Sequence, residues 1–123
     1  MTGDRPFPMQ EHPVTLPSGR VIVVLNQIVV SQRGVSGGSL GIQYRSQVSA
    51  VDRAEQLSEA REVAELHRAF AEAQGYTLSA QICNTPAAAE TREPPERAFY
   101  FARSDAGEWQ LQFTVGADGL REP

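Results

Sequence analysis

The chain offers few side chains for nucleophilic catalysis: a single cysteine, Cys83, and two histidines, His12 and His67. A thiol enzyme needs a base beside its cysteine. Cys83 is out of step with the alternating apolar residues of 78–82, so its side chain is predicted to leave the sheet away from the helix that carries His67. His12 lies in a segment without a predicted element, which is a poor way to hold a general base. An enzyme using Cys83 or His67 therefore ranks behind two binding functions.

Other chemistry has less support in the sequence. His12, His67 and Cys83 lack the spacing of a metal site, and acidic residues such as Glu55 and Glu59 are expected in an acidic helix. The glycine-rich residues 34–38 lead into a strand without a following lysine, which favours a hairpin loop over a phosphate-binding loop. We therefore expect no catalytic residue, no metal and no cofactor.

Composition narrows the classes of partner and compartment. A chain of 123 residues with a net charge of −4 and no run of basic residues is typical of a single domain that does not bind nucleic acid. The longest apolar run, residues 21–25, is too short to cross a bilayer, so no membrane partner is expected. The first residues lack the apolar centre of a signal peptide, which predicts a cytoplasmic protein.

A long helix is predicted over residues 53–74. Asp52 can cap its N-terminus, Glu55 can complete a capping box, and Gly75 can take the left-handed position after its last turn. Apolar residues at helical spacing place His67 on the face predicted to be buried. A neutral, hydrogen-bonded imidazole is the favoured interpretation of His67 there.

Alternating residues predict strands before and after this helix. Residues 14–16 and 21–25 flank a Pro-Ser-Gly turn, and residues 21–31, rich in valine and isoleucine, predict a long strand with a bulge near Asn26. Residues 40–48, 78–83, 98–103 and 109–115 alternate apolar and polar side chains. The predicted fold is α+β, an antiparallel sheet of about five strands with one long helix packed on one face, in the order β-β-α-β-β-β. Residues 1–13 are predicted to be an extended arm, 14–115 a single domain and 116–123 a tail.

The alternation divides the side chains between two faces of the predicted sheet. The core is expected to come from the helix and the sheet face toward it, and to consist of Leu57, Val63, Ala64, Phe70, Ile28, Val30, Leu40, Ile42, Tyr44, Leu78, Ile82, Phe99, Phe101, Trp109, Leu111 and Phe113. The other face is polar, which is typical of a solvated antiparallel sheet or of a surface that binds a protein. The candidate partner-binding residues are Arg45, Gln43, Gln81, Cys83, Tyr100 and Gln112.

Two binding functions follow from this layout. The first is a non-enzymatic protein-binding module of inhibitor, immunity or adaptor type, which uses the polar sheet face or a strand edge. The alternative is a small-ligand pocket between helix and sheet, lined by His67, Tyr44 and Trp109. A homodimer is also predicted, because one helix covers only part of such a sheet. A pocket requires a cavity beside His67, whereas a binding module requires a filled core and an exposed face or edge.

Overall fold

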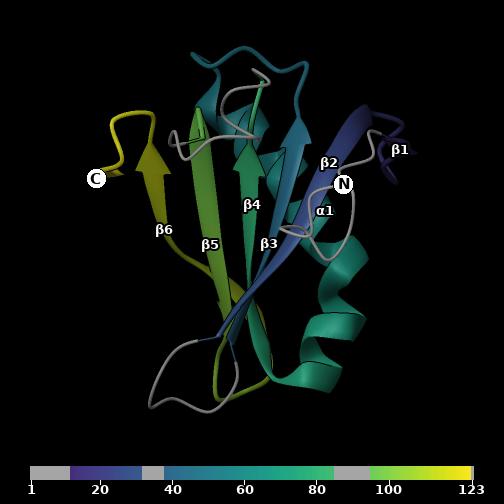
Figure 1. Cartoon of the computed structure of the whole chain (residues 1–123), viewed down its shortest axis with the longest axis vertical. Coiled ribbons are helices and arrows are strands. Elements are labelled where there is room, and N and C mark those ends of the chain that lie inside the picture. The colour runs from purple at the N-terminus through teal and green to yellow at the C-terminus, as the bar shows by residue number, and fades with distance from the viewer. Residues whose placement is uncertain (1–11, 32–37, 85–94, 123) are drawn as a thin grey trace, which may run out of the picture.

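The computed structural model describes residues 12–31, 38–84 and 95–122. In chain order the elements are β1 (His12–Thr15), β2 (Val21–Ser31), β3 (Gly38–Arg45), α1 (Arg53–Gln74), β4 (Tyr76–Ile82), β5 (Arg97–Arg103), β6 (Trp109–Gly116) and β7 (Arg121–Glu122). The strands form one open sheet in the order in which they occur in the chain, and α1 lies against one face (Figure 1). The α+β class, with one long helix on a mostly antiparallel sheet, is as predicted.

The sheet has seven strands rather than about five, and one neighbouring pair is parallel. β3 and β4 run parallel because α1 connects them across the sheet, whereas the other neighbouring pairs are antiparallel. β1 corresponds to the short strand predicted at residues 14–16, and β7 is the strand that was not predicted. β7 consists of two residues, too few to show an alternating pattern in the sequence.

Local signals determine both ends of α1. The Asp52 carboxylate accepts a hydrogen bond from the Glu55 backbone N–H at 3.1 Å, and Gly75 has a φ of 74° in the left-handed region. The second half of the predicted capping box does not form. The Asp52 N–H instead donates to the carbonyl of Ser49 at 3.0 Å, while the Glu55 carboxylate pairs with Arg20. Within the described ranges, no helix is long and apolar enough to cross a membrane.

The core lies between α1 and the sheet, where the helix packs mainly against β4 and β5. The rotation of α1 about its own axis differs from the prediction: Phe70 is 51 % exposed, whereas Gln56 and Glu59 are buried. Gln56 accepts a hydrogen bond from Arg97 of β5. Burial raises the pKa of Tyr44 in the core, and the negative charge of Glu59 raises it further. The partner Arg97 explains why Gln56 faces inward, whereas Glu59 Oε1 and the Tyr44 hydroxyl have no hydrogen-bond partner among the described residues.

Candidate functional site

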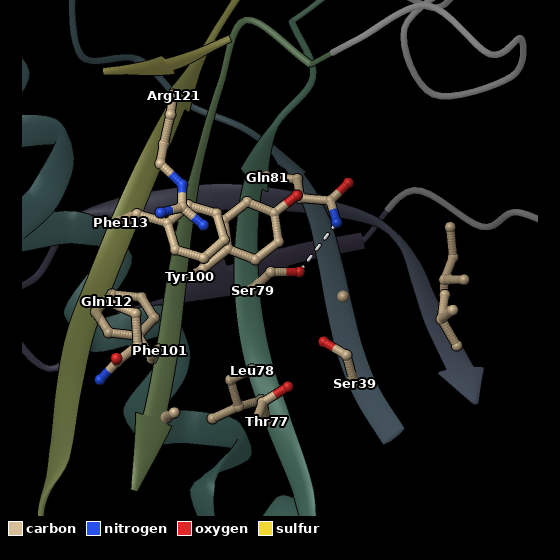
Figure 2. Close-up of a pocket in the computed structure, with 14 residues that line it drawn as sticks. Ser39, Thr77, Leu78, Ser79, Gln81, Tyr100, Phe101, Gln112, Phe113 and Arg121 are labelled. Carbon is tan, nitrogen blue, oxygen red and sulfur yellow. Dashed lines mark hydrogen bonds between the residues drawn. The ribbon is translucent and has the colours of Figure 1, made fainter. Parts of the chain in front are cut away.

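The sheet face opposite α1 carries an open groove with a volume of about 770 Å³ (Figure 2). Small side chains of β3 and β4 form its floor, and larger side chains of β2, β5 and β6 form its two walls. The floor contains Ser39, Gly41, Thr77 and Ser79, one wall contains Ile28 and Val30, and the other contains Tyr100 and Phe113. A floor of small residues between larger ones leaves room for an inserted group.

A β-bulge in β2 turns Ile28 and Val30 toward this groove. The pairing of β2 with β3 shifts register between Val24 and Asn26, which confirms the predicted bulge. Beyond an extra residue, the alternating side chains exchange faces. The prediction that Ile28 and Val30 belong to the core is therefore wrong: they are 36 % and 55 % exposed, and Val24 is the buried residue before the bulge.

A second bulge has the same effect on β6. The pairing of β5 with β6 shifts between Tyr100 and Phe101, so that Phe113 lies opposite Tyr100 instead of facing the helix. The two rings stack with centroids 4.6 Å apart. Thr114 takes the helix side, where it is buried and its hydroxyl accepts a hydrogen bond from Arg53 at 2.8 Å. Phe113 is thus a wall of the groove rather than the predicted core residue.

Arg121 of β7 extends the aromatic wall. Its guanidinium carbon lies 3.9 Å from the centroid of the Phe113 ring, and Figure 2 shows the group in front of that ring. The neighbouring Glu122 points to the helix side, where Arg97 donates to both of its carboxylate oxygens at 3.0 and 3.1 Å. Because successive strand residues face opposite sides, this anchored Glu122 holds Arg121 on the groove side.

The floor is held by a chain of side-chain hydrogen bonds. The Gln43 amide donates to Gln81 Oε1 at 3.4 Å, and Gln81 Nε2 donates to Ser79 Oγ at 3.0 Å. These hydrogen-bonded side chains lie across Gly41, where an added Cβ would come within 2.8 Å of Gln81 Nε2 and 3.2 Å of Ser79 Oγ. Gly41 therefore gives the Gln81 side chain the space to lie flat on the floor.

The groove combines apolar walls and a floor of small, mostly polar side chains with one positive charge among its described residues. Among the described residues that line it, Arg121 is the only one with a formal charge. The described part of the chain places no carboxylate within ion-pair distance of its guanidinium, which instead lies over the ring of Phe113. The groove can therefore accommodate apolar groups along its length and an anionic group at the Arg121 end.

The predicted partner-binding residues divide into two groups. Gln81, Tyr100 and Gln112 line the groove. Gln43 is buried beside Gln81 and supports it. The other two lie elsewhere: Arg45 is half-buried outside the groove lining, and Cys83 is buried next to Leu25 and Val23.

The structure does not bring His67, Tyr44 and Trp109 together around a pocket. The His67 ring lies on the β2 side of α1, with Nδ1 2.9 Å from the Val63 carbonyl and Nε2 3.2 Å from the Gln27 amide nitrogen. Trp109 contacts the other side of α1, where its indole N–H donates to Glu72 at 2.8 Å. Tyr44 is fully buried in the core. Since a carbonyl can only accept, Nδ1 of His67 donates to Val63, and the remaining ring nitrogen, Nε2, faces the Gln27 amide.

A smaller cavity of about 220 Å³ lies on the Trp109 side of α1. It is lined by Phe101 and Trp109 from the sheet and by Ala64 and charged residues of the helix, including Arg61. This cavity is not beside His67, whose Nε2 faces Gln27 of β2. Neither this cavity nor the groove lies beside His67, where the ligand-pocket interpretation requires a cavity.

The candidate chemical groups are also separate. Burial raises the pKa of the Cys83 thiol to about 11, and Cys83 packs in a small cluster with Leu25 rather than near His67. Burial also raises the pKa of Glu59, which lies in the helix–sheet interface away from the groove. The described residues contain no group of three His, Cys, Asp or Glu side chains that could hold a metal ion.

Of the residues that line the groove, only Gln81, Tyr100 and Gln112 were predicted to bind a partner; those missed include Ile28, Val30, Gly41, Phe113 and Arg121. The bulge expected near Asn26 was the one available signal, since it implies that the residues after it change faces. A scan of protein-family models and searches of curated proteins and of solved structures found no match to this chain, so its site is interpreted from its own residues.

Proposed function

We propose that this protein is a binding module that holds a segment of a partner protein in the groove on the uncovered face of its sheet. The observation that carries the proposal is the pairing of apolar walls with a floor of small residues, on a face that otherwise faces solvent. A merely solvated face of an antiparallel sheet has polar side chains pointing outward. Here Ile28, Val30 and Phe113 point outward instead.

The shape of the groove favours a polypeptide over a compact ligand. The groove spans the sheet from β2 to β6, about 19 Å for strands that lie about 4.8 Å apart. It is open along this length, whereas sites for small molecules enclose most of the ligand surface. A chain segment can cross such a surface and place one apolar side chain on the floor at Gly41 and Ser79.

The chemistry of the walls specifies the segment further. Tyr, Phe and Arg side chains are enriched where protein interfaces gain most of their affinity. Tyr100, Phe113 and Arg121 form such a group, already stacked against one another before a partner arrives. The expected segment carries at least one large apolar side chain and an acidic side chain or terminal carboxylate that reaches Arg121.

Selection from a random peptide library tests this proposal although the partner is unidentified. Peptides selected on the wild-type protein should share an apolar residue and a carboxylate. Two matched pairs of variants locate the site: Arg121→Glu against Arg61→Glu, an exposed helix arginine, and Phe113→Ala against Phe70→Ala on the opposite side of the sheet.

We expect Arg121→Glu and Phe113→Ala to weaken binding of the selected peptides about tenfold or more, equivalent to about 1.4 kcal/mol, with Arg61→Glu and Phe70→Ala unchanged. Equal binding by both members of each pair would refute the groove as the site. The groove volume also falls within the range of small-molecule sites. If no peptide is selected, and a small organic anion binds the wild type but not Arg121→Glu, the ligand of the groove is such an anion rather than a peptide.

A further inference from the structure

The second half of β2 has exposed apolar side chains and, among the described strands, an unpaired edge. β1 pairs only with Val21, Ile22, Val23 and Val24, while β3 occupies the other side of β2 as far as Ser31. On the β1 side, therefore, no described strand pairs with residues 25–31. An edge of this kind presents backbone N–H and C=O groups that can pair with another strand.

Beyond the bulge between Val24 and Asn26, the described part of this edge lacks the features that normally prevent pairing between molecules. Edge strands are commonly protected by charged side chains, by proline or by their short length. β2 has eleven residues, and none of them is charged or proline. Ile28, Val29 and Val30 are all exposed, Ile28 and Val30 on the groove side and Val29 on the helix side.

The helix continues the apolar surface beside this edge. His67 contacts Gln27 of β2, and Phe70 lies one turn further along the same side of α1. Leu66 and Phe70 are both exposed on α1, on the side of the sheet that also presents Val29. A strand added at this edge would lie beside exposed apolar side chains of β2 on both faces of the sheet.

We infer that this edge pairs with the same edge of a second copy of the chain, antiparallel about a two-fold axis. The segment 26–31 is self-complementary, because pairing about Ile28 places Ile28 opposite its own copy and Gln27 opposite Val29 without bringing like charges together. Because residues 26–31 carry no charge, this segment offers an oppositely charged partner no advantage over a second copy. The two seven-stranded sheets become continuous, with both helices on one face and both grooves on the other.

This inference does not depend on what the groove binds. Its test is the mass of the full chain by sedimentation equilibrium over a range of concentrations, with Val29→Lys and Val21→Lys as matched variants. Both valines lie on β2 and are similarly exposed, at 46 % and 43 %, but Val21 pairs with β1. Neither residue lines the groove, so peptide binding to these variants reports on the groove separately.

The wild type and Val21→Lys are expected to reach twice the 13.4 kDa mass of one chain. Val29→Lys should raise the dimer dissociation constant about tenfold or more, because two lysines then meet near the axis. A monomeric wild type, or a dimer with equal dissociation constants in both variants, would overturn the inference.

Amide hydrogen exchange on the wild type gives a second test that needs no variant. Exchange of those amides of 26–30 that face away from β3 should slow as protein concentration rises, because dimerisation removes them from water. Protection of these amides that does not change with concentration, in a monomer, would overturn the inference and assign the edge to a strand of the same chain.

Discussion

Phe113 of β6 stacks on Tyr100 of β5, with 4.6 Å between ring centroids, because a bulge moves Phe113 out of the helix-facing row of its strand. The same change of side places Thr114 beneath α1, in hydrogen-bond contact with Arg53. One irregularity in the ladder therefore builds both the wall of the groove and a polar contact of the core.

The Tyr100–Phe113 stack should show measurable coupling. In a double-mutant cycle, the Tyr100→Ala and Phe113→Ala changes in unfolding free energy should differ from additivity by about 0.5–1.5 kcal/mol. Urea unfolding of the two single variants and the double variant gives this number. Additive effects would mean that the rings are adjacent without stabilising one another, and that the wall is not preformed.

The ion pair between Arg97 and Glu122 should stabilise the fold at neutral pH. Hydrogen bonding by Arg97 lowers the pKa of Glu122 in the folded protein. A lowered pKa contributes stability above the unfolded-state pKa, and this contribution is lost as pH falls through the folded-state pKa. We expect Glu122→Gln to cost about 1–2 kcal/mol at pH 7 and to approach the wild type in acid. Urea unfolding at several pH values measures this; a cost that does not vary with pH would contradict it.

Glu122→Gln should also weaken peptide binding in the groove, because Glu122 holds β7 and hence Arg121 in place. The control is Glu108→Gln, an exposed turn residue. Binding that is as strong in Glu122→Gln as in Glu108→Gln would show that Arg121 does not need this anchor.

The contribution of Glu59 to stability should have the opposite pH dependence to that of Glu122. Burial raises the pKa of Glu59 above the usual value of 4.5, and its Oε1 atom has no hydrogen-bond partner among the described residues. A raised pKa means that the group contributes most below the unfolded-state pKa and that this stability is lost as pH rises through the folded-state pKa. The Glu59→Gln variant should therefore gain stability relative to wild type as pH rises through that interval. Thermal unfolding over this pH range measures the difference; a constant or falling difference would contradict the assignment.

Cys83 should be almost unreactive in the folded protein. At pH 8 a thiol with a pKa of about 11 is ionised about 100-fold less than one with the usual value of 9.0, and burial limits access further. Iodoacetamide labelling followed by mass spectrometry should be slower than in urea by at least that factor. Rapid labelling of the native protein would instead indicate an accessible thiol and would reopen the question of its chemistry.

The sequence by itself determined the features that depend on near neighbours in the chain. Asp52 and Gly75 place the ends of α1, because capping involves atoms only a few residues apart. The alternation of apolar residues predicts the main strands, and the interruption at Asn26 predicts a bulge, which the pairing of β2 with β3 contains.

Tertiary structure decided which side of the sheet each residue faces. A bulge exchanges the two faces for every residue after it, and the bulge in β6 depends on pairing with β5, which no short window of sequence contains. The position of Arg121 depends on Arg97, a residue of another strand, holding Glu122. Likewise, α1 turns Gln56 rather than Phe70 inward because the partner of Gln56, Arg97, lies on the sheet. The groove therefore arises from pairing between distant segments, whereas the helix and strands that carry it follow from local sequence.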